Sequence, residues 1–280
     1  MAFVRTAPDS KHDAFTHGKQ RTTFTNPAVH RAVLRRGLLV PHALATAVTR
    51  CPSCCVSFAQ PLQASEWAVC EHAIACKNGG VCVASGEVAC PRLVHNRVVA
   101  ALSAILRAAG YGTRLEVRNL AVGSGRRPGD VVADDNEHTG KLLVAGAPAD
   151  ARYVIDVTVA YVETNTVGRV AARKGGEAAL KAEEKKERDK PELRHEHADF
   201  VPFALDSWGC PAPKATKLLH ALAERAASTM DKGKEYEAVL VARWRQWISV
   251  ALHNGVAELQ HARLSAGAAQ HPVGALAGGA

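Results

Sequence analysis

Two short β-branched runs of the sequence carry one acidic residue each: Arg126-Arg127-Pro128-Gly129-Asp130-Val131-Val132 and Tyr153-Val154-Ile155-Asp156-Val157-Thr158-Val159. Runs of this length and composition, bounded by turn residues, are typical of β-strands. Neighbouring strands of one sheet would present the two carboxylates side by side, as a metal site for a substrate phosphate needs. A nuclease is therefore the first hypothesis. The alternative is ordinary turn chemistry, because Pro-Gly-Asp is a common turn tripeptide.

Composition is that of an ordinary soluble protein with a core. The chain has 280 residues, 47% of them hydrophobic and 22% charged, which suits one large domain or two small ones. Lys and Arg outnumber Asp and Glu by 35 to 27, so the surface should attract polyanions such as nucleic acid, DNA or RNA. No run approaches the roughly 18 apolar residues of a membrane span, and the start lacks an apolar signal segment. We expect a nuclear or cytoplasmic protein.

Cysteines cluster near the N-terminus. Seven of the eight fall between Cys51 and Cys90. The Cys51-Pro52-Ser53-Cys54 turn offers two thiolates, and His72 and Cys76 add two ligands at helical spacing, which predicts a structural Zn²⁺ site. The ligand set stays open, and a second ion is possible, because five further ligand-type residues lie nearby: Cys55, Cys70, Cys82, Cys90 and His95.

Periodicity predicts an α/β core. Helical patterns cover residues 95–109 and 167–189 and a pair of helices over 214–261, with Gly110 as the left-handed cap of the first. Strand patterns cover 113–117, 130–133, 141–144, 153–161 and 199–206. Two short helices are expected between residues 28 and 49. Trp244 and Trp247 could stack on bases, but their helical spacing favours the core.

The motifs occur in an order that resembles a known family. They are Cys51-x-x-Cys54, His72 with Cys76, His95-Asn96, Arg127-Pro128-x-Asp130, Asp156-Val157-Thr158-Val159, a lysine-rich helix and Phe200-Val201-Pro202. Over roughly residues 35 to 260, this order is similar to the C-terminal region of site-specific non-LTR retrotransposon proteins. There, a CCHC zinc knuckle precedes a restriction-endonuclease-like domain of the PD-(D/E)xK class, itself downstream of a reverse transcriptase.

The resemblance implies a domain plan. Residues 1–34 would be a flexible lead-in, 35–92 the helical CCHC zinc region, and 93–210 a restriction-endonuclease-like core with a central mixed sheet flanked by helices. Residues 211–264 would form C-terminal helices and 265–280 a disordered tail. The chain lacks the catalytic aspartate pair of a reverse transcriptase, so we expect a fragment or free-standing derivative that does not copy RNA.

The resemblance also implies a Mg²⁺-dependent endodeoxyribonuclease that nicks target DNA. Asp130 matches the first acid of the motif and Asp156 the second, so both would bind Mg²⁺. Glu116 resembles the helper acid of the class. The equally supported alternative is that Glu116 is an exposed carboxylate on a strand. Gly129 stands where the class usually has proline, a mild departure.

The lysine of the motif departs further from the standard pattern. Thr158 occupies the usual lysine position, two residues after the second acid. In the retrotransposon family the following helix supplies the lysine, which points here to Lys186 first and Lys185 second. The alternative is that both lysines belong to the solvated surface of this helix.

DNA contacts are expected at Arg126, Arg127, Arg92 and Arg97, through phosphates more than bases. Two other classes remain open. One is a catalytically inactive, zinc-containing nucleic-acid-binding remnant of a retrotransposon protein. The other is a metal-free interaction protein that assembles through its C-terminal helices. A separation of more than about 8 Å between the Asp130 and Asp156 carboxylates, with no lysine nearby, would argue against shared metal binding.

Overall fold

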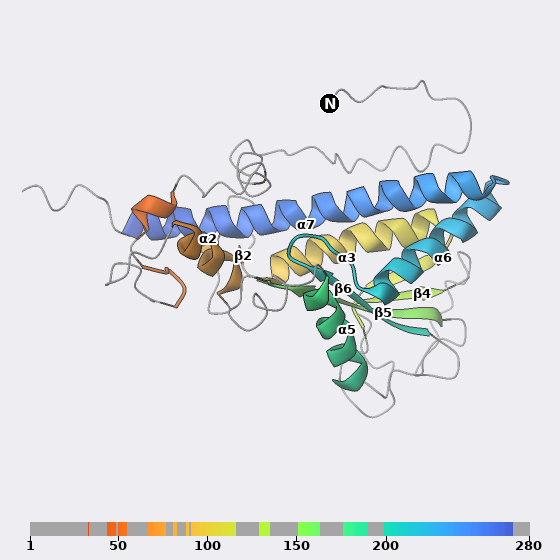
Figure 1. Ribbon diagram of the computed structural model, residues 1–280, viewed down its shortest axis with the longest axis horizontal. Helices are drawn as coiled ribbons and strands as arrows, with labels where there is room; N and C mark the ends of the chain where they lie inside the picture. The colour runs from red at the N-terminus through yellow and green to blue at the C-terminus, as the bar shows by residue number, and fades with distance from the viewer. Residues whose placement is uncertain are drawn as a thin grey trace, which may run out of the picture.

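The computed structural model describes the parts of the chain that build one α/β core and a small cysteine-rich module (Figure 1). The described residues are 33, 44–48, 50–54, 66–76, 81–82, 88–89, 91–115, 129–134, 151–162, 176–189 and 199–270. Among them, no helix combines the length and apolar composition needed to cross a bilayer.

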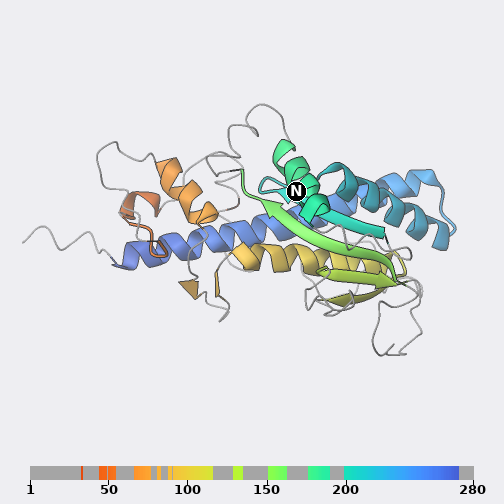
Figure 2. The ribbon, with the colours of Figure 1, turned by 90° about the horizontal axis from the view of Figure 1, so that it is seen from below.

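A four-stranded mixed sheet forms the centre of the core, in the order β3 (Gly112–Leu115), β4 (Val131–Asp134), β5 (Ala151–Ala160), β6 (Asp199–Asp206). The first three strands pair antiparallel, and β6 pairs parallel with β5. β5 is the longest strand and runs past the start of β4, as Figure 2 shows. The part of β5 from Asp156 onward therefore has no β4 residue opposite it.

Different helices cover the two faces of this sheet, because side chains alternate along each strand. Ile155 and Phe203 belong to the main apolar core together with Leu102 of α3 (Pro91–Ala108) and Leu222 of α6 (Pro213–Thr229). On the opposite face, Ala204 packs with alanines of α5 (Glu177–Asp189). Since Asp156 alternates with Ile155, its side chain belongs to the face that α5 covers.

Helix α3 ends as its sequence predicts. Gly110 follows the helix in the left-handed region, with φ 80°. The Tyr111 amide N–H donates to the Leu106 carbonyl at 3.0 Å, which satisfies one of the last carbonyls of the helix. Arg225 of α6 donates from Nε to the Ala109 carbonyl at 3.1 Å, so a side chain from a distant helix completes the cap.

The long helix α7 (Lys234–Gln270) forms an outer layer against α3 and α6 and continues to the cysteine-rich module (Figure 1). With about 1.5 Å of rise per residue, its 37 residues span roughly 55 Å. It lies close to α3 at Gly255, where an added Cβ would stand 2.9 Å from Cα of Val94. Trp244 of α7 is fully buried in the core, as its helical spacing favours.

The cysteine-rich module comprises the 3₁₀ turn η2 (Ala45–Ala47), helix α2 (Glu66–Ala75) and the hairpin β1 (Val81–Cys82) with β2 (Val88–Ala89). A second apolar cluster joins it to the last turns of α7, where Leu264 packs with Val48 and Val69. The C-terminal half of α7 thus belongs to this module as much as to the core.

The predicted α/β class and mixed, helix-flanked sheet are confirmed, and β6 has the predicted bounds. Helix α3 begins at Pro91 rather than residue 95. The prediction of a disordered tail is wrong for residues 265–270, because α7 continues to Gln270, and residues 271–280 lie outside the described residues. Alanine favours helix, and Gly267 lets the helix approach Val48 closely. The expected strand over 141–144, the lead-in 1–34 except residue 33, and most of 28–49 lie outside the described residues.

Candidate functional site

The two predicted acids lie next to each other at one point of the sheet: Asp156 is on β5, and Asp130 directly precedes the adjacent strand β4. The Asp130 amide N–H donates to the Ile155 carbonyl at 2.8 Å, which extends the β4–β5 ladder and places Asp130 beside Asp156. Gly129 packs directly on β5, since an added Cβ would stand 2.8 Å from the Ile155 carbonyl oxygen. This contact explains why glycine stands at a position where the motif class usually has proline.

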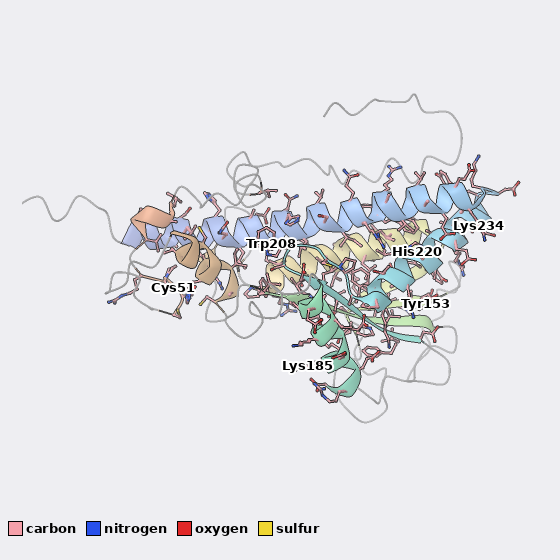
Figure 3. The ribbon with its side chains drawn as sticks, in the orientation of Figure 1. Cys51, Tyr153, Lys185, Trp208, His220 and Lys234 are labelled. Atoms are coloured by element: carbon pink, nitrogen blue, oxygen red, sulfur yellow. The ribbon has the colours of Figure 1, made fainter. Side chains whose placement is uncertain are left out.

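Lys186 of α5 joins the two acids from the face of the sheet that α5 covers. Its Nζ lies 2.8 Å from Oδ2 of Asp156, whose side chain is only 6% exposed. The contact exists because Asp156 faces α5, and Lys186 lies on the inner surface of that helix. Lys185, the second choice from sequence, is 67% exposed and pairs with Asp189 on its own helix instead. Figure 3 shows Lys185 on α5.

His95 of α3 also reaches this site. Its Nε2 lies 2.9 Å from Oδ2 of Asp130, and the Val157 amide N–H donates to the same oxygen at 2.8 Å. Burial disfavours the charged form of each partner, but mutual hydrogen bonding and charge outweigh it. The pKa of His95 is therefore raised above its ordinary 6.5, and the pKa of Asp130 is lowered below 3.8, with a further contribution from a hydrogen bond to Asp156.

His95, Asp130 and Lys186 line one cavity of about 420 Å³ along the part of β5 that extends beyond β4, and Asp156 contacts Lys186 beside it. Its lining includes Arg92, His95, Asp130, Thr158, Tyr161 and Lys186. The volume lies in the range of small-molecule and substrate pockets. The Thr158 hydroxyl is buried without a hydrogen-bond partner among the described residues, so the site has spare polar capacity beside its carboxylates.

A second candidate site lies in the cysteine-rich module, away from α5; Figure 3 shows Cys51 there. The ligand atoms of Cys51, Cys54, His72 and Cys76 all lie within 4.8 Å of one another, close enough to hold a metal ion. Sγ of Cys51 and Sγ of Cys76 are 3.9 Å apart. Ligands about 2.3 Å from a tetrahedral ion lie about 3.8 Å from each other, so this spacing fits such an ion.

The surroundings favour the deprotonated, metal-binding forms of two of these ligands. Burial raises the pKa of the Cys51 thiol, but hydrogen bonds from Cys54 and Ser53 lower it by more. The pKa of His72 is lowered by burial and then by the positive charge of Arg263. A neutral imidazole and a thiolate are the forms that bind a metal ion.

Arg263 of α7 is buried beside this centre, with 1% of its surface exposed. Its Nη1 donates to the carbonyls of Ala73 and Cys76 at 3.0 and 2.7 Å, where helix α2 ends. A cation at a helix C-terminus satisfies the last carbonyls. Arg263 therefore links the ligand helix to α7, a role that no local sequence pattern signals.

The remaining predicted residues divide into three groups. Arg92 is exposed at the cavity, as a phosphate contact requires. Arg97 is instead committed to α7, because its Nε and Nη2 donate to Oε2 of Glu258 at 3.0 and 2.6 Å. Glu116, Arg126 and Arg127 lie outside the described residues.

Of the alternative zinc ligands, His95 is wrong, since it lies at the carboxylate site rather than in the cysteine cluster. Cys70 is fully buried among apolar residues of the second cluster. Comparison of the chain with protein-family models, curated proteins and solved structures finds no match.

Proposed function

We propose that this protein is a metal-dependent DNA endonuclease of the PD-(D/E)xK type, related to the nuclease region of non-LTR retrotransposon proteins. One observation carries the proposal: Lys186 Nζ lies 2.8 Å from Oδ2 of Asp156, beside Asp130 on the next strand. Three elements far apart in sequence thus bring together the two acids and the lysine that the resemblance implies. The mixed sheet, with β6 parallel to β5, supports a restriction-endonuclease-like core.

The donor set fits a hard divalent cation such as Mg²⁺: Asp130 offers carboxylate oxygens at the cavity, where the Thr158 hydroxyl has no partner among the described residues, and Asp156 offers its carboxylate beside Lys186. Such an ion supplies Lewis acidity and a more acidic bound water. The protein's own groups do the rest. Asp130 and Asp156 would hold the ion, and the Lys186 ammonium would stabilise negative charge that develops on the phosphate. Arg92 at the cavity attracts the DNA backbone.

We assign a structural Zn²⁺ ion to the CCHC centre, which is formed by Cys51, Cys54, His72 and Cys76. Three thiolates and one imidazole are a common donor set for structural zinc and leave no open coordination position for chemistry. Metal analysis of the purified protein tests this assignment. We expect one equivalent of zinc, and absence of stoichiometric zinc would contradict it.

Nicking of a supercoiled plasmid in Mg²⁺ at low salt tests the nuclease. We expect wild type to nick, and Asp156→Ala to lose at least about 100-fold in rate. Asp199→Ala is the matched control, because Asp199 is an exposed aspartate at the start of the neighbouring strand β6. A wild type that does not nick, or an Asp156→Ala variant that nicks normally, would overturn the proposal.

The two adjacent lysines of α5 provide a sharper comparison. Lys186→Met removes the ammonium beside Asp156 and should reduce nicking about 100-fold. Lys185→Met removes an exposed charge of the same helix and should change nicking less than about twofold. Equal effects of the two substitutions would contradict the assignment of Lys186.

A catalytically inactive nucleic-acid-binding remnant is the second candidate. Thr158 at the usual lysine position favours it, and the CCHC centre is independent of the carboxylates. Fluorescence anisotropy with a labelled duplex distinguishes the two. DNA binding without nicking by wild type would support the remnant.

A further inference from the structure

Asp130 is held by two hydrogen-bond donors on one and the same oxygen. His95 Nε2 lies 2.9 Å from Oδ2, and the Val157 amide N–H donates to Oδ2 at 2.8 Å. One donor comes from helix α3 and the other from strand β5, so the carboxylate is fixed from two directions. Neither of these two donors engages the other oxygen, Oδ1.

The imidazole itself is fixed. His95 lies within the first turns of α3, next to the fully buried Val94 and near the fully buried Val98. Its other ring nitrogen, Nδ1, lies 3.3 Å from the Asn96 side-chain oxygen. A ring anchored through its helix and engaged at both nitrogens has one preferred orientation, with Nε2 toward Asp130.

We propose that His95 is a positioning residue for the metal-binding carboxylate of Asp130, and that it directs Oδ1 rather than Oδ2 to the ion. The inference rests on the proposed function. His95 donates Nε2–H to Oδ2, which would hold the carboxylate plane so that Oδ1 is the oxygen offered to the ion. Partners that orient ligating groups in this way typically contribute about 10–100-fold to metal affinity or activity.

A direct ligand role for His95 is the competing arrangement. It would require the imidazole to turn Nε2 from Asp130 to the ion and to give up the 2.9 Å contact. It would also change the donor set from oxygens to oxygens plus nitrogen, which suits transition metals better than Mg²⁺. The two arrangements therefore differ in a spectroscopic signature.

Binding of Mn²⁺ to the full-length, zinc-loaded protein without DNA, followed by electron paramagnetic resonance, tests the proposal. His95→Ala and His95→Asn remove the donor or place it out of reach, and should weaken Mn²⁺ binding about 10–100-fold. His95→Gln can place an amide N–H near Oδ2 and should restore most of the affinity. His220→Ala is the control, because His220 is half-exposed on α6 and pairs with Glu237.

Nicking kinetics add a second readout. His95→Ala and His95→Asn should need more Mg²⁺ for half-maximal nicking. Their nicking rate at saturating Mg²⁺ should fall by a smaller factor than their affinity for Mg²⁺. Near pH 9, where the charge pairing of His95 with Asp130 is lost, truncation of the 27% exposed His95 side chain should leave thermal unfolding nearly unchanged. A merely structural role would lower stability without a selective change in the Mg²⁺ requirement.

Each outcome has a distinct meaning. Wild-type affinity in His95→Ala, or failure of His95→Gln to restore it, would overturn the positioning role and leave the nuclease proposal standing. A nitrogen hyperfine coupling from a bound imidazole in wild type would overturn it in favour of a direct ligand. A wild type that neither binds Mn²⁺ nor nicks DNA would overturn the proposed function, and the role of His95 with it.

Discussion

Replacing Arg263 with methionine should weaken the protein much more when the CCHC centre holds zinc than when it does not. The guanidinium is 1% exposed and donates to the Ala73 and Cys76 carbonyls at 3.0 and 2.7 Å. Three thiolates, one neutral imidazole and a divalent ion carry one net negative charge. Arg263 balances that charge in the zinc-bound protein.

The magnitude follows from these contacts. Removing one partner of a buried charge pair costs about 3–5 kcal/mol, which is the expected loss with zinc. Without zinc the anionic metal–thiolate cluster is absent, and the substitution then removes only the two hydrogen bonds to the Ala73 and Cys76 carbonyls. The expected loss is then about 1–2 kcal/mol, that of hydrogen bonds alone. The difference of about 2 kcal/mol corresponds to roughly 30-fold weaker zinc binding.

Urea unfolding with zinc and with a chelator measures both losses, and competition with a chromophoric chelator measures zinc affinity. Arg245→Met is the matched control, because Arg245 is an exposed arginine of the same helix. It should change stability by less than about 0.5 kcal/mol in either state. An equal loss for Arg263→Met with and without zinc, or unchanged zinc affinity, would refute the charge-balancing role.

Two further predictions concern packing and pH. Gly255→Ala should destabilise the protein by about 1–3 kcal/mol in thermal unfolding, because its Cβ would stand 2.9 Å from Cα of Val94. Gly233→Ala is the control and should be neutral or slightly stabilising, because its Cβ would have no atom within 4 Å. In metal-free protein, the contribution of the His95–Asp130 pair should be present from above pH 3.8 to below pH 6.5 and be lost as pH rises through the raised pKa of His95. The stability difference between wild type and Asp130→Asn should therefore be about 1 kcal/mol larger near pH 5.5 than near pH 9, and a constant difference would contradict the pairing.

The sheet could be predicted where local pattern alone determines structure. The run at residues 199–206 is apolar, is bounded by aspartates and precedes a Trp-Gly turn, and the structure gives the same bounds for β6. The end of α7 could not be predicted in the same way. Its alanines and glycines look like a tail, but Gly267 fits against Val48, which lies more than two hundred residues away in sequence.

The candidate site could likewise be predicted from sequence only in part. Asp130 and Asp156 could be paired from sequence because each occupies the edge of a strand pattern. Lys186 could be chosen over Lys185 only from the family resemblance, since the rotation of α5 against the sheet is a tertiary property. The contact of His95 with Asp130 had no local signal at all, because it joins a helix to a strand edge 35 residues later.

Anomalous diffraction from crystals of the protein grown with Mn²⁺ would test the proposed ion at Asp130 and Asp156 directly, and any zinc bound at the CCHC centre would give an internal reference at its own absorption edge. We expect a manganese peak within coordination distance of both Asp130 and Asp156, on the Oδ1 side of Asp130. Saturating Mn²⁺ with no peak between these two carboxylates would contradict a shared metal site and the nuclease built on it.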